Sequence, residues 1–246
     1  MSLTRPGRTI TSPSRARPVS RRARRGSTWL VPAALVALAF VPVLAGSSRL
    51  VEQAGGPQLL PLPARLDDPS PVPLVVHIVS VIVYAVLGAF QFSAGIRRRR
   101  IGWHRAAGRL LVVVGLVVAM SALWLTLVFP RSSGGDLLHV FRLLAASGMA
   151  ASLVLGVAAV VRRDVPRHRA WMIRAYALAL GAGTQVLTVG LGEVVFGDSD
   201  LDVALQQGAA WAINLAVAEW LIRRRTTRRR PARRAALEAA VRAAST

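Results

Sequence analysis

Residues 108–129 read GRLLVVVGLVVAMSALWLTLVF, and this stretch decides the class of the fold. Arg109 is its only charged residue, and everything after it is apolar or small. A helix needs about 20 such residues, at 1.5 Å of rise each, to cross the hydrocarbon core of a bilayer. The stretch therefore predicts a membrane-spanning helix.

Further apolar runs lie on both sides of this one. Closed barrels need strands of about ten residues with alternating hydrophobicity, and the sequence has none. Helices satisfy their backbone hydrogen bonds internally, as lipid requires. We expect an all-α membrane protein with six transmembrane helices, the middle four forming a four-helix core. The predicted spans are 29–46, 73–95, 108–129, 137–161, 171–191 and 203–222.

The composition agrees with a membrane protein. Of the 246 residues, 53% are hydrophobic, and the mean hydropathy is +0.46. The net charge of +21 comes from arginine alone, because the chain has no lysine. These arginines flank apolar segments, and no nucleic-acid recognition motif accompanies them, so we expect no nucleic-acid partner. The absence of cysteine excludes disulfides and thiolate metal sites.

The arginines also predict the orientation of the chain. Residues 1–28, 97–109, 162–174 and 223–246 hold 28 of the 32 arginines, and eight of the eleven acidic residues lie in the remaining loops. Arginine-rich loops stay in the cytoplasm. We expect a multi-pass protein of the plasma membrane with both termini in the cytoplasm. Clusters of this kind attract anionic lipid, so the expected partner is a bilayer that includes anionic lipid.

Three segments outside the core remain to be interpreted. Residues 1–28 predict a disordered Arg-rich cytoplasmic tail, and the proline-rich residues 56–74 predict an extended outer loop. Residues 223–246 predict a second Arg-rich cytoplasmic tail, with an Ala-rich end suited to an interfacial helix. Residues 29–222 form the transmembrane domain between the tails. Two interpretations of the first run stay open, a retained helix or a signal peptide cleaved near Ala45.

The core contains an internal sequence repeat, called the internal echo below. Residues 97–106 resemble residues 161–170 at an offset of 64, and His77 and His139 lie 62 apart. The second and third spans therefore resemble the fourth and fifth, and we expect a two-helix repeat.

The chain has only four histidines, and the topology sorts them into two pairs. His77 and His139 fall near the outer face, whereas His104 and His168 fall at the inner face. Two facing imidazoles can hold the iron of a b-type haem. The sequence thus raises the hypothesis of haem b held by these pairs. The outer pair is the stronger candidate because both of its residues lie within apolar runs.

Other interpretations of the same residues stay open. All four histidines can be structural, satisfied by neighbouring polar groups. Arg142, one turn after His139, suits a haem propionate or an anionic substrate, but an ion pair with Asp136 explains it equally well.

Three polar residues of the later spans have simpler interpretations. For Glu219 we expect an ion pair with Arg223, four residues on. For Gln91 and Gln185 we expect hydrogen bonds between helices. No metalloprotease, phosphate-loop or Ser–His–Asp motif is visible, so no enzymatic activity is assigned.

The sequence resembles a known family in four segments: 88–92 (GAFQF), 104–109 (HRAAGR), 168–176 (HRAWMIRAY) and 181–185 (GAGTQ). These resemble the uncharacterised bacterial membrane proteins called domain of unknown function 2306, over roughly residues 73–222. That resemblance implies a membrane protein and no particular activity.

The histidine layout is similar in arrangement to transmembrane di-haem b cytochromes, which implies electron transfer with a quinone or another redox partner. The alternative function is a cofactor-free transporter subunit or scaffold.

Overall fold

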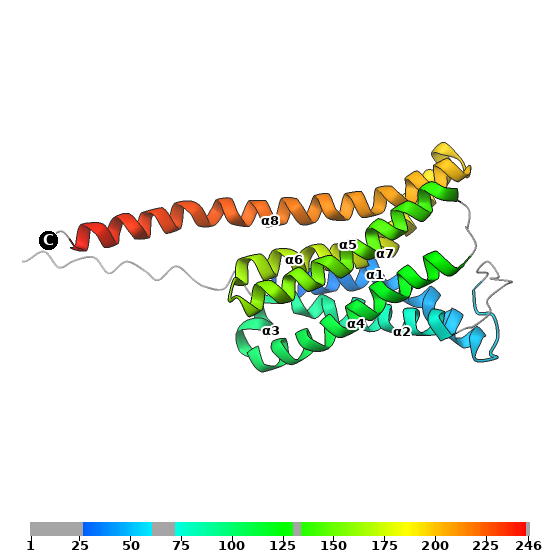
Figure 1. The fold of residues 1–246 in the computed structure, drawn as a ribbon, viewed down its shortest axis with the longest axis horizontal. Coiled ribbons are helices and arrows are strands. Elements are labelled where there is room, and N and C mark those ends of the chain that lie inside the picture. Colours follow the sequence, from blue (N-terminus) through cyan, green and yellow to red (C-terminus); the bar gives the residue numbers. More distant parts are fainter. Residues whose placement is uncertain (1–26, 61–71, 130–133, 245–246) are drawn as a thin grey trace, which may run out of the picture.

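The computed structural model describes residues 27–60, 72–129 and 134–244, and all secondary structure within these ranges is helical. The predicted all-α class is therefore confirmed. Figure 1 shows the helices gathered along one long axis, with the end of α8 projecting beyond the others. Residues 1–26 of the predicted disordered tail lie outside the described residues, and so does most of the predicted proline-rich loop. The helices are α1 (Ser27–Gln53), α2 (Val72–Gln91), α3 (Ala94–Arg99), α4 (Ile101–Val128), α5 (Gly135–Val161), α6 (Val165–Ala179), α7 (Gly181–Phe196) and α8 (Asp200–Ala244).

Four of these helices are long and apolar enough to cross a membrane, namely α1, α2, α4 and α5. Together, α6 and α7 qualify as a fifth span, bent by 44° at the break between them. The predicted sixth span falls in α8, which is not among the candidates because Gln206, Gln207, Asn214 and Glu219 interrupt its apolar run. Length and composition of the described helices thus support four or five spans, where the sequence predicted six.

The outward faces of the helices suit lipid. On α4, Val113, Met120 and Leu127 recur every seven residues, and each is more than half exposed. Leu111 and Val118 on the opposite face are buried. A contiguous apolar stripe that faces away from the protein marks contact with membrane rather than with water.

The helices extend further than the apolar runs that predicted them. Helix α4 begins at Ile101, inside the predicted inner loop, and α8 continues through the predicted boundary at residue 222 to Ala244. Arginine and alanine are good helix formers, so a helix can continue after its apolar run has ended. Residues 223–244, which fall in the predicted Arg-rich tail, are therefore a helical continuation of α8.

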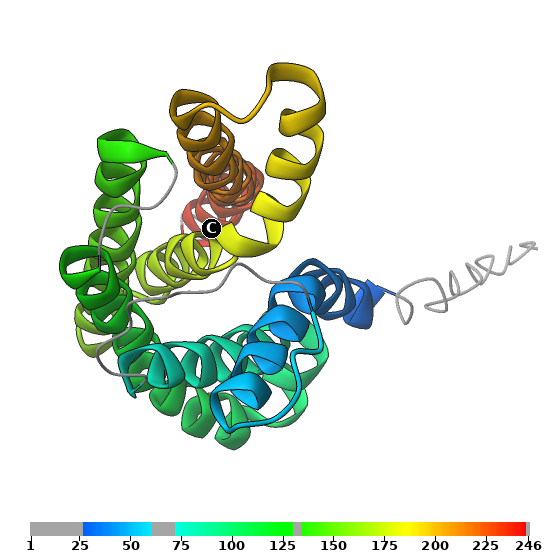
Figure 2. The ribbon, with the colours of Figure 1, turned by 90° about the vertical axis from the view of Figure 1, so that its right-hand side faces the viewer.

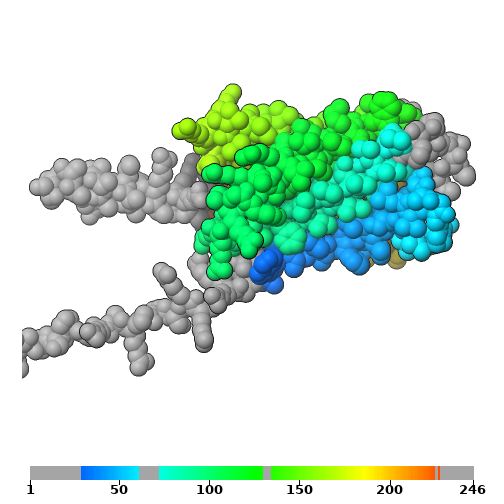
Figure 3. Space-filling view, turned by 90° about the horizontal axis from the view of Figure 1, so that it is seen from below, coloured from blue at the N-terminus to red at the C-terminus, as the bar shows by residue number. Residues whose placement is uncertain are grey.

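A ring of four helices forms the core of the bundle. Helix α2 packs on α4, α4 on α5, α5 on α6, and α6 on α2. The diagonal helices, α2 with α5 and α4 with α6, have no substantial contact. Helix α1 packs on α2 and α7, and α8 packs on α5, α6 and α7. Figure 2 shows this arrangement end-on, and Figure 3 shows α1, α2 and α4 side by side on one face.

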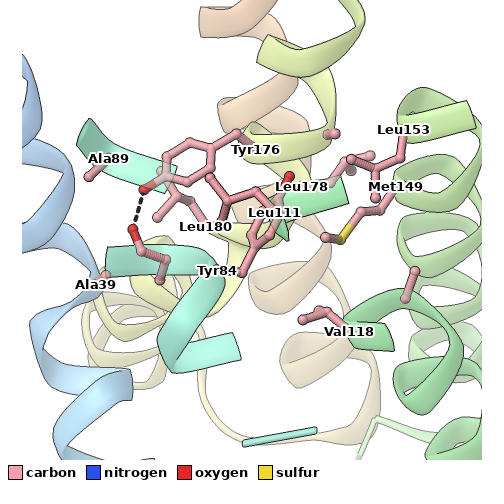
Figure 4. Close-up of a cluster of buried hydrophobic side chains, with 13 residues drawn as sticks. Ala39, Tyr84, Ala89, Leu111, Val118, Met149, Leu153, Tyr176, Leu178 and Leu180 are labelled. Atoms are coloured by element: carbon pink, nitrogen blue, oxygen red, sulfur yellow. Dashed lines mark hydrogen bonds between the residues drawn. The ribbon is translucent and has the colours of Figure 1, made fainter. Parts of the chain in front are cut away.

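The aromatic side chains of Tyr84 and Tyr176 fill the middle of the four-helix ring (Figure 4). A Cβ atom at Gly88 would lie 2.4 Å from the Tyr176 ring, and one at Gly115 would lie 2.6 Å from the Tyr84 ring. Glycine is therefore required at both positions for the rings to fit. The Tyr176 hydroxyl donates to the carbonyl oxygen of Ala85 at 2.7 Å, which joins α6 to α2.

Candidate functional site

The four histidines form two layers at opposite ends of the ring. His77 on α2 and His139 on α5 lie toward the predicted outer end, and His104 on α4 and His168 on α6 lie toward the predicted inner end. All four side chains are half-buried. Because α2 is diagonal to α5 and α4 is diagonal to α6, each layer takes its two histidines from helices on opposite sides of the ring.

In the inner layer, one imidazole is anchored by the backbone. His168 Nδ1 lies 2.8 Å from the carbonyl oxygen of Gly156 on α5. A carbonyl only accepts hydrogen bonds, so Nδ1 carries the proton. His104 lies within electrostatic range of His168, Arg97 and Arg105, and its own Nδ1 is buried without a hydrogen-bond partner. The structure therefore places the two inner histidines within electrostatic range of each other.

In the outer layer, His77 is held by α4. Its Nδ1 lies 2.9 Å from the Oγ of Ser121, which is buried. His139 lies one turn into α5, and Arg142 follows one turn later, half-buried. Arg142 and Asp136 both have interaction partners in the structure. Ser121 was not predicted from the sequence, although the antiparallel pairing of α2 with α4 places it opposite His77.

Aromatic side chains occupy the space between the two layers. The Tyr84 and Tyr176 ring centroids are 5.9 Å apart, and those of Phe92 and Tyr176 are 4.9 Å apart. This packing limits any cofactor in the ring to its ends. Among the described residues, no group of three or more His, Asp or Glu side chains could hold a metal ion. A bis-imidazole haem site needs only two.

The predicted partner of Glu219 was wrong. Its carboxylate accepts from the guanidinium of Arg174 on α6, with Nε and Oε1 2.5 Å apart. The Arg174 guanidinium also lies 4.5 Å from the centre of the Trp171 ring. Helical spacing suggested Arg223, but the contact between α6 and α8 offers Glu219 a guanidinium that reaches it directly.

The break between α6 and α7 is stabilised by α8. In an unbroken helix, the carbonyl of Ala177 would accept from the N–H of Gly181. Here Asn214 Nδ2 donates to that carbonyl at 3.0 Å, and Asn214 Oδ1 accepts from the hydroxyl of Thr184 at 2.8 Å. One amide on α8 therefore bridges both sides of the break. No pattern in the sequence pointed to Asn214.

The two mid-helix glutamines behave differently from each other. Gln185 donates to the carbonyl of Gln207 on α8 at 3.4 Å, as expected of a bond between helices. Both polar atoms of the Gln91 side chain are buried and have no hydrogen-bond partner, so the expected bond is not formed.

Comparison with known proteins gives a family and no activity. Residues 74–222 match the model of a family described as predicted membrane protein, DUF2306. The chain belongs to this family. The match runs from the start of α2 into α8, so it includes the ring, both histidine layers and the break. No curated protein and no solved structure matches this DUF2306 chain.

Proposed function

We propose that this protein is a b-type haem-binding electron carrier of the membrane, and that His104 and His168 are the first pair of haem ligands. The observation that supports this proposal is the placement of two half-buried histidines from diagonal helices at each end of a four-helix ring. Ligands on facing helices of a bundle are a common way to hold a cofactor. His104 and His168 are named first because they lie within electrostatic range of each other.

The chemistry of the inner pair fits an iron ligand. His168 donates its Nδ1 proton to Gly156, so its Nε2 carries the lone pair that a metal requires. Ligating histidines generally donate their other ring nitrogen to a carbonyl or carboxylate in this way. Arg97, near His104, supplies a positive charge for a haem propionate. Bound haem would supply a centre that accepts and releases one electron at a time.

The outer pair is the proposed second haem site. His77 lies near the start of α2, and His139 and Arg142 lie near the start of α5, at the same end of the ring. Arg142 is the proposed propionate partner there. Two sites at opposite ends of the ring would serve to move electrons across the membrane. A quinone or another redox protein is the proposed exchange partner.

An absorbance spectrum tests this proposal. We expect wild-type protein from cells supplied with iron and haem precursor to show a b-type α-band in a dithionite-reduced minus oxidised spectrum. His104→Ala and His168→Ala should each remove the inner contribution, and His77→Ala and His139→Ala the outer one. Thr188→Ala is the matched control, because its hydroxyl bonds only to the backbone of its own helix. A colourless, folded wild type would overturn the haem proposal.

We further propose that the protein crosses the plasma membrane six times and that both of its termini lie in the cytoplasm. The asymmetric distribution of arginine supports this orientation, and so do the arginine–tryptophan contacts at the inner end. The guanidinium of Arg224 lies 4.7 Å from the centre of the Trp220 ring, near the end of the proposed sixth span. Anionic lipid is the proposed partner of these arginines.

The break between α6 and α7 favours a second candidate, a cofactor-free transporter. Interrupted helices with polar side chains at the break form the substrate sites of many transporters. The chain has no cysteine, so Thr184→Cys introduces a single thiol at the break. Labelling of this thiol by a membrane-impermeant maleimide would support a water-filled path. An unreactive thiol in folded protein would count against it, and Gly190→Cys, on the exposed face of α7, measures reactivity in contact with lipid.

A further inference from the structure

One imidazole in each histidine layer is held through its Nδ1 atom. In the inner layer, His168 bonds to the backbone carbonyl of Gly156 at 2.8 Å. In the outer layer, His77 bonds to the side-chain hydroxyl of Ser121 at 2.9 Å. The two contacts come from different helices and different chemical groups, yet each engages the same ring nitrogen.

The neighbours of Ser121 decide which atom carries the proton. A serine hydroxyl has one proton to donate and two lone pairs that accept. The Oγ of Ser121 lies 2.7 Å from the carbonyl oxygen of Val117 and 3.0 Å from that of Val118, both of which only accept. The hydroxyl proton therefore goes to the backbone of α4, as is usual for serine within membrane helices. The lone pair left on Oγ accepts the Nδ1 proton of His77.

We propose that Ser121 is a positioning residue that holds His77 in the Nδ1–H tautomer, as the Gly156 carbonyl holds His168. Each anchored ring then presents an unprotonated Nε2. This Nε2 atom would be a ligand of the haem iron. The purpose assigned to the tautomer therefore rests on the proposed function. The tautomer itself does not require haem and is measurable in its absence.

Histidine tautomers are measured directly by ¹⁵N NMR. Only four histidines need to be labelled, and single His→Ala variants assign them. In haem-free protein in detergent, we expect His77 and His168 to be protonated at Nδ1 and unprotonated at Nε2. Ser121→Ala should shift His77 toward the Nε2–H form while His168 stays unchanged. Ser121→Thr keeps the hydroxyl and should restore the wild-type signal of His77.

A matched control lies on the same helix. The hydroxyl of Thr126 donates to the carbonyl of Ala122 at 2.7 Å, the same kind of bond that Ser121 makes. Thr126→Ala should therefore leave the His77 signal unchanged. The His168 signal shows in the same spectrum whether each variant is folded. A wild-type His77 protonated at Nε2, or a His77 signal that ignores Ser121→Ala in folded protein, would overturn the proposal.

Haem-loaded protein provides the second arm of the test. Loss of a hydrogen bond to a metal-ligating histidine typically weakens metal binding by about 10- to 100-fold. We expect Ser121→Ala to weaken haem binding at the outer site by that factor and to leave the inner site unchanged. Equal weakening at both sites, or none, would refute the positioning role. A colourless wild type with the expected tautomers would instead refute the proposed function and leave the tautomer assignment in place.

Discussion

Helix α4 and the α6–α7 pair occupy equivalent places in the internal echo of the sequence but have different structures. Each starts at the inner end with a His-Arg-Ala segment, at residues 104–106 and 168–170. Helix α4 then runs unbroken for 28 residues, whereas α6 ends after 15 residues and α7 continues at a 44° bend. Similar sequence at the start of a helix thus does not determine how the helix continues.

The difference arises from the neighbours of each helix. After Leu180, the second copy reads Gly181-Ala182-Gly183-Thr184, which allows very close packing. The carbonyl oxygen of Leu38 on α1 would lie 2.3 Å from a Cβ atom at Gly183. That carbonyl has no helical donor four residues on, because Pro42 lacks an N–H. Helix α7 therefore packs against α1 and α8, away from the ring that α4 helps to form.

The largest expected effect concerns the direction of the bent pair. If α6 and α7 together cross the membrane as α4 does, a reporter fused after Asp200 should report the outer side, like one fused after Arg131. Fusions after Arg99 and Asp164 should report the cytoplasm. Alkaline phosphatase and green fluorescent protein, active on opposite sides, measure this. A cytoplasmic signal after Asp200 would mean that α6 and α7 return to the cytoplasmic side without crossing the membrane.

Gly183→Ala should destabilise the protein strongly, because α1 and α7 leave no room for a side chain at this position. The added methyl group would overlap a backbone carbonyl, which cannot rotate away, and overpacking of this kind costs about 1–3 kcal/mol or more. Thermal unfolding in detergent, followed by circular dichroism, measures the effect. Gly190→Ala on the same helix is the control, because its Cβ would meet no atom within 4 Å. Equal stability of the two variants would contradict the close packing of α1 on α7.

Asn214→Ala should have a smaller effect on the free energy of unfolding. It removes two hydrogen bonds that bridge the break, and hydrogen bonds between membrane helices contribute about 0.6 kcal/mol each on average. We expect a loss of about 1 kcal/mol in the same unfolding measurement. Thr188→Ala serves as the control and should change stability little. If Asn214→Ala left stability unchanged, α8 would not be what stabilises the break.

Glu219→Gln should have the smallest effect on stability. The side chains of Glu219 and Arg174 are 34% and 25% exposed, and solvent weakens ion pairs of this kind to about 0.5 kcal/mol. Arg174→Gln should cost about as much, and Arg223→Gln less. The double variant Glu219→Gln/Arg174→Gln should cost no more than either single one, if the two residues act as a pair. Greater sensitivity to Arg223→Gln would restore the partner that the sequence suggested.

Much of the fold could be predicted from the sequence, and less of the site. The apolar runs located four spans to within a few residues at most ends, because an apolar run of spanning length is a local property. The break at Leu180 was missed, since residues 171–191 form one hydrophobic run on average and hydropathy does not reveal a bend. The four histidines were identified by their rarity and topology. Ser121, Asn214 and the partner of Glu219 were not, because their roles depend on helices distant in the sequence.

By itself, the sequence determined that this protein lies in a membrane, that it is helical, and that its histidines fall in two layers. These properties follow from composition and period along the chain, where each residue contributes independently of the rest. Only the tertiary structure decided which helices are neighbours, that α7 leaves the ring, and which groups hold His77, His168 and Glu219. A hydrogen bond forms only at about 3 Å, and residues 44 or 45 positions apart reach that distance only once the helices have packed.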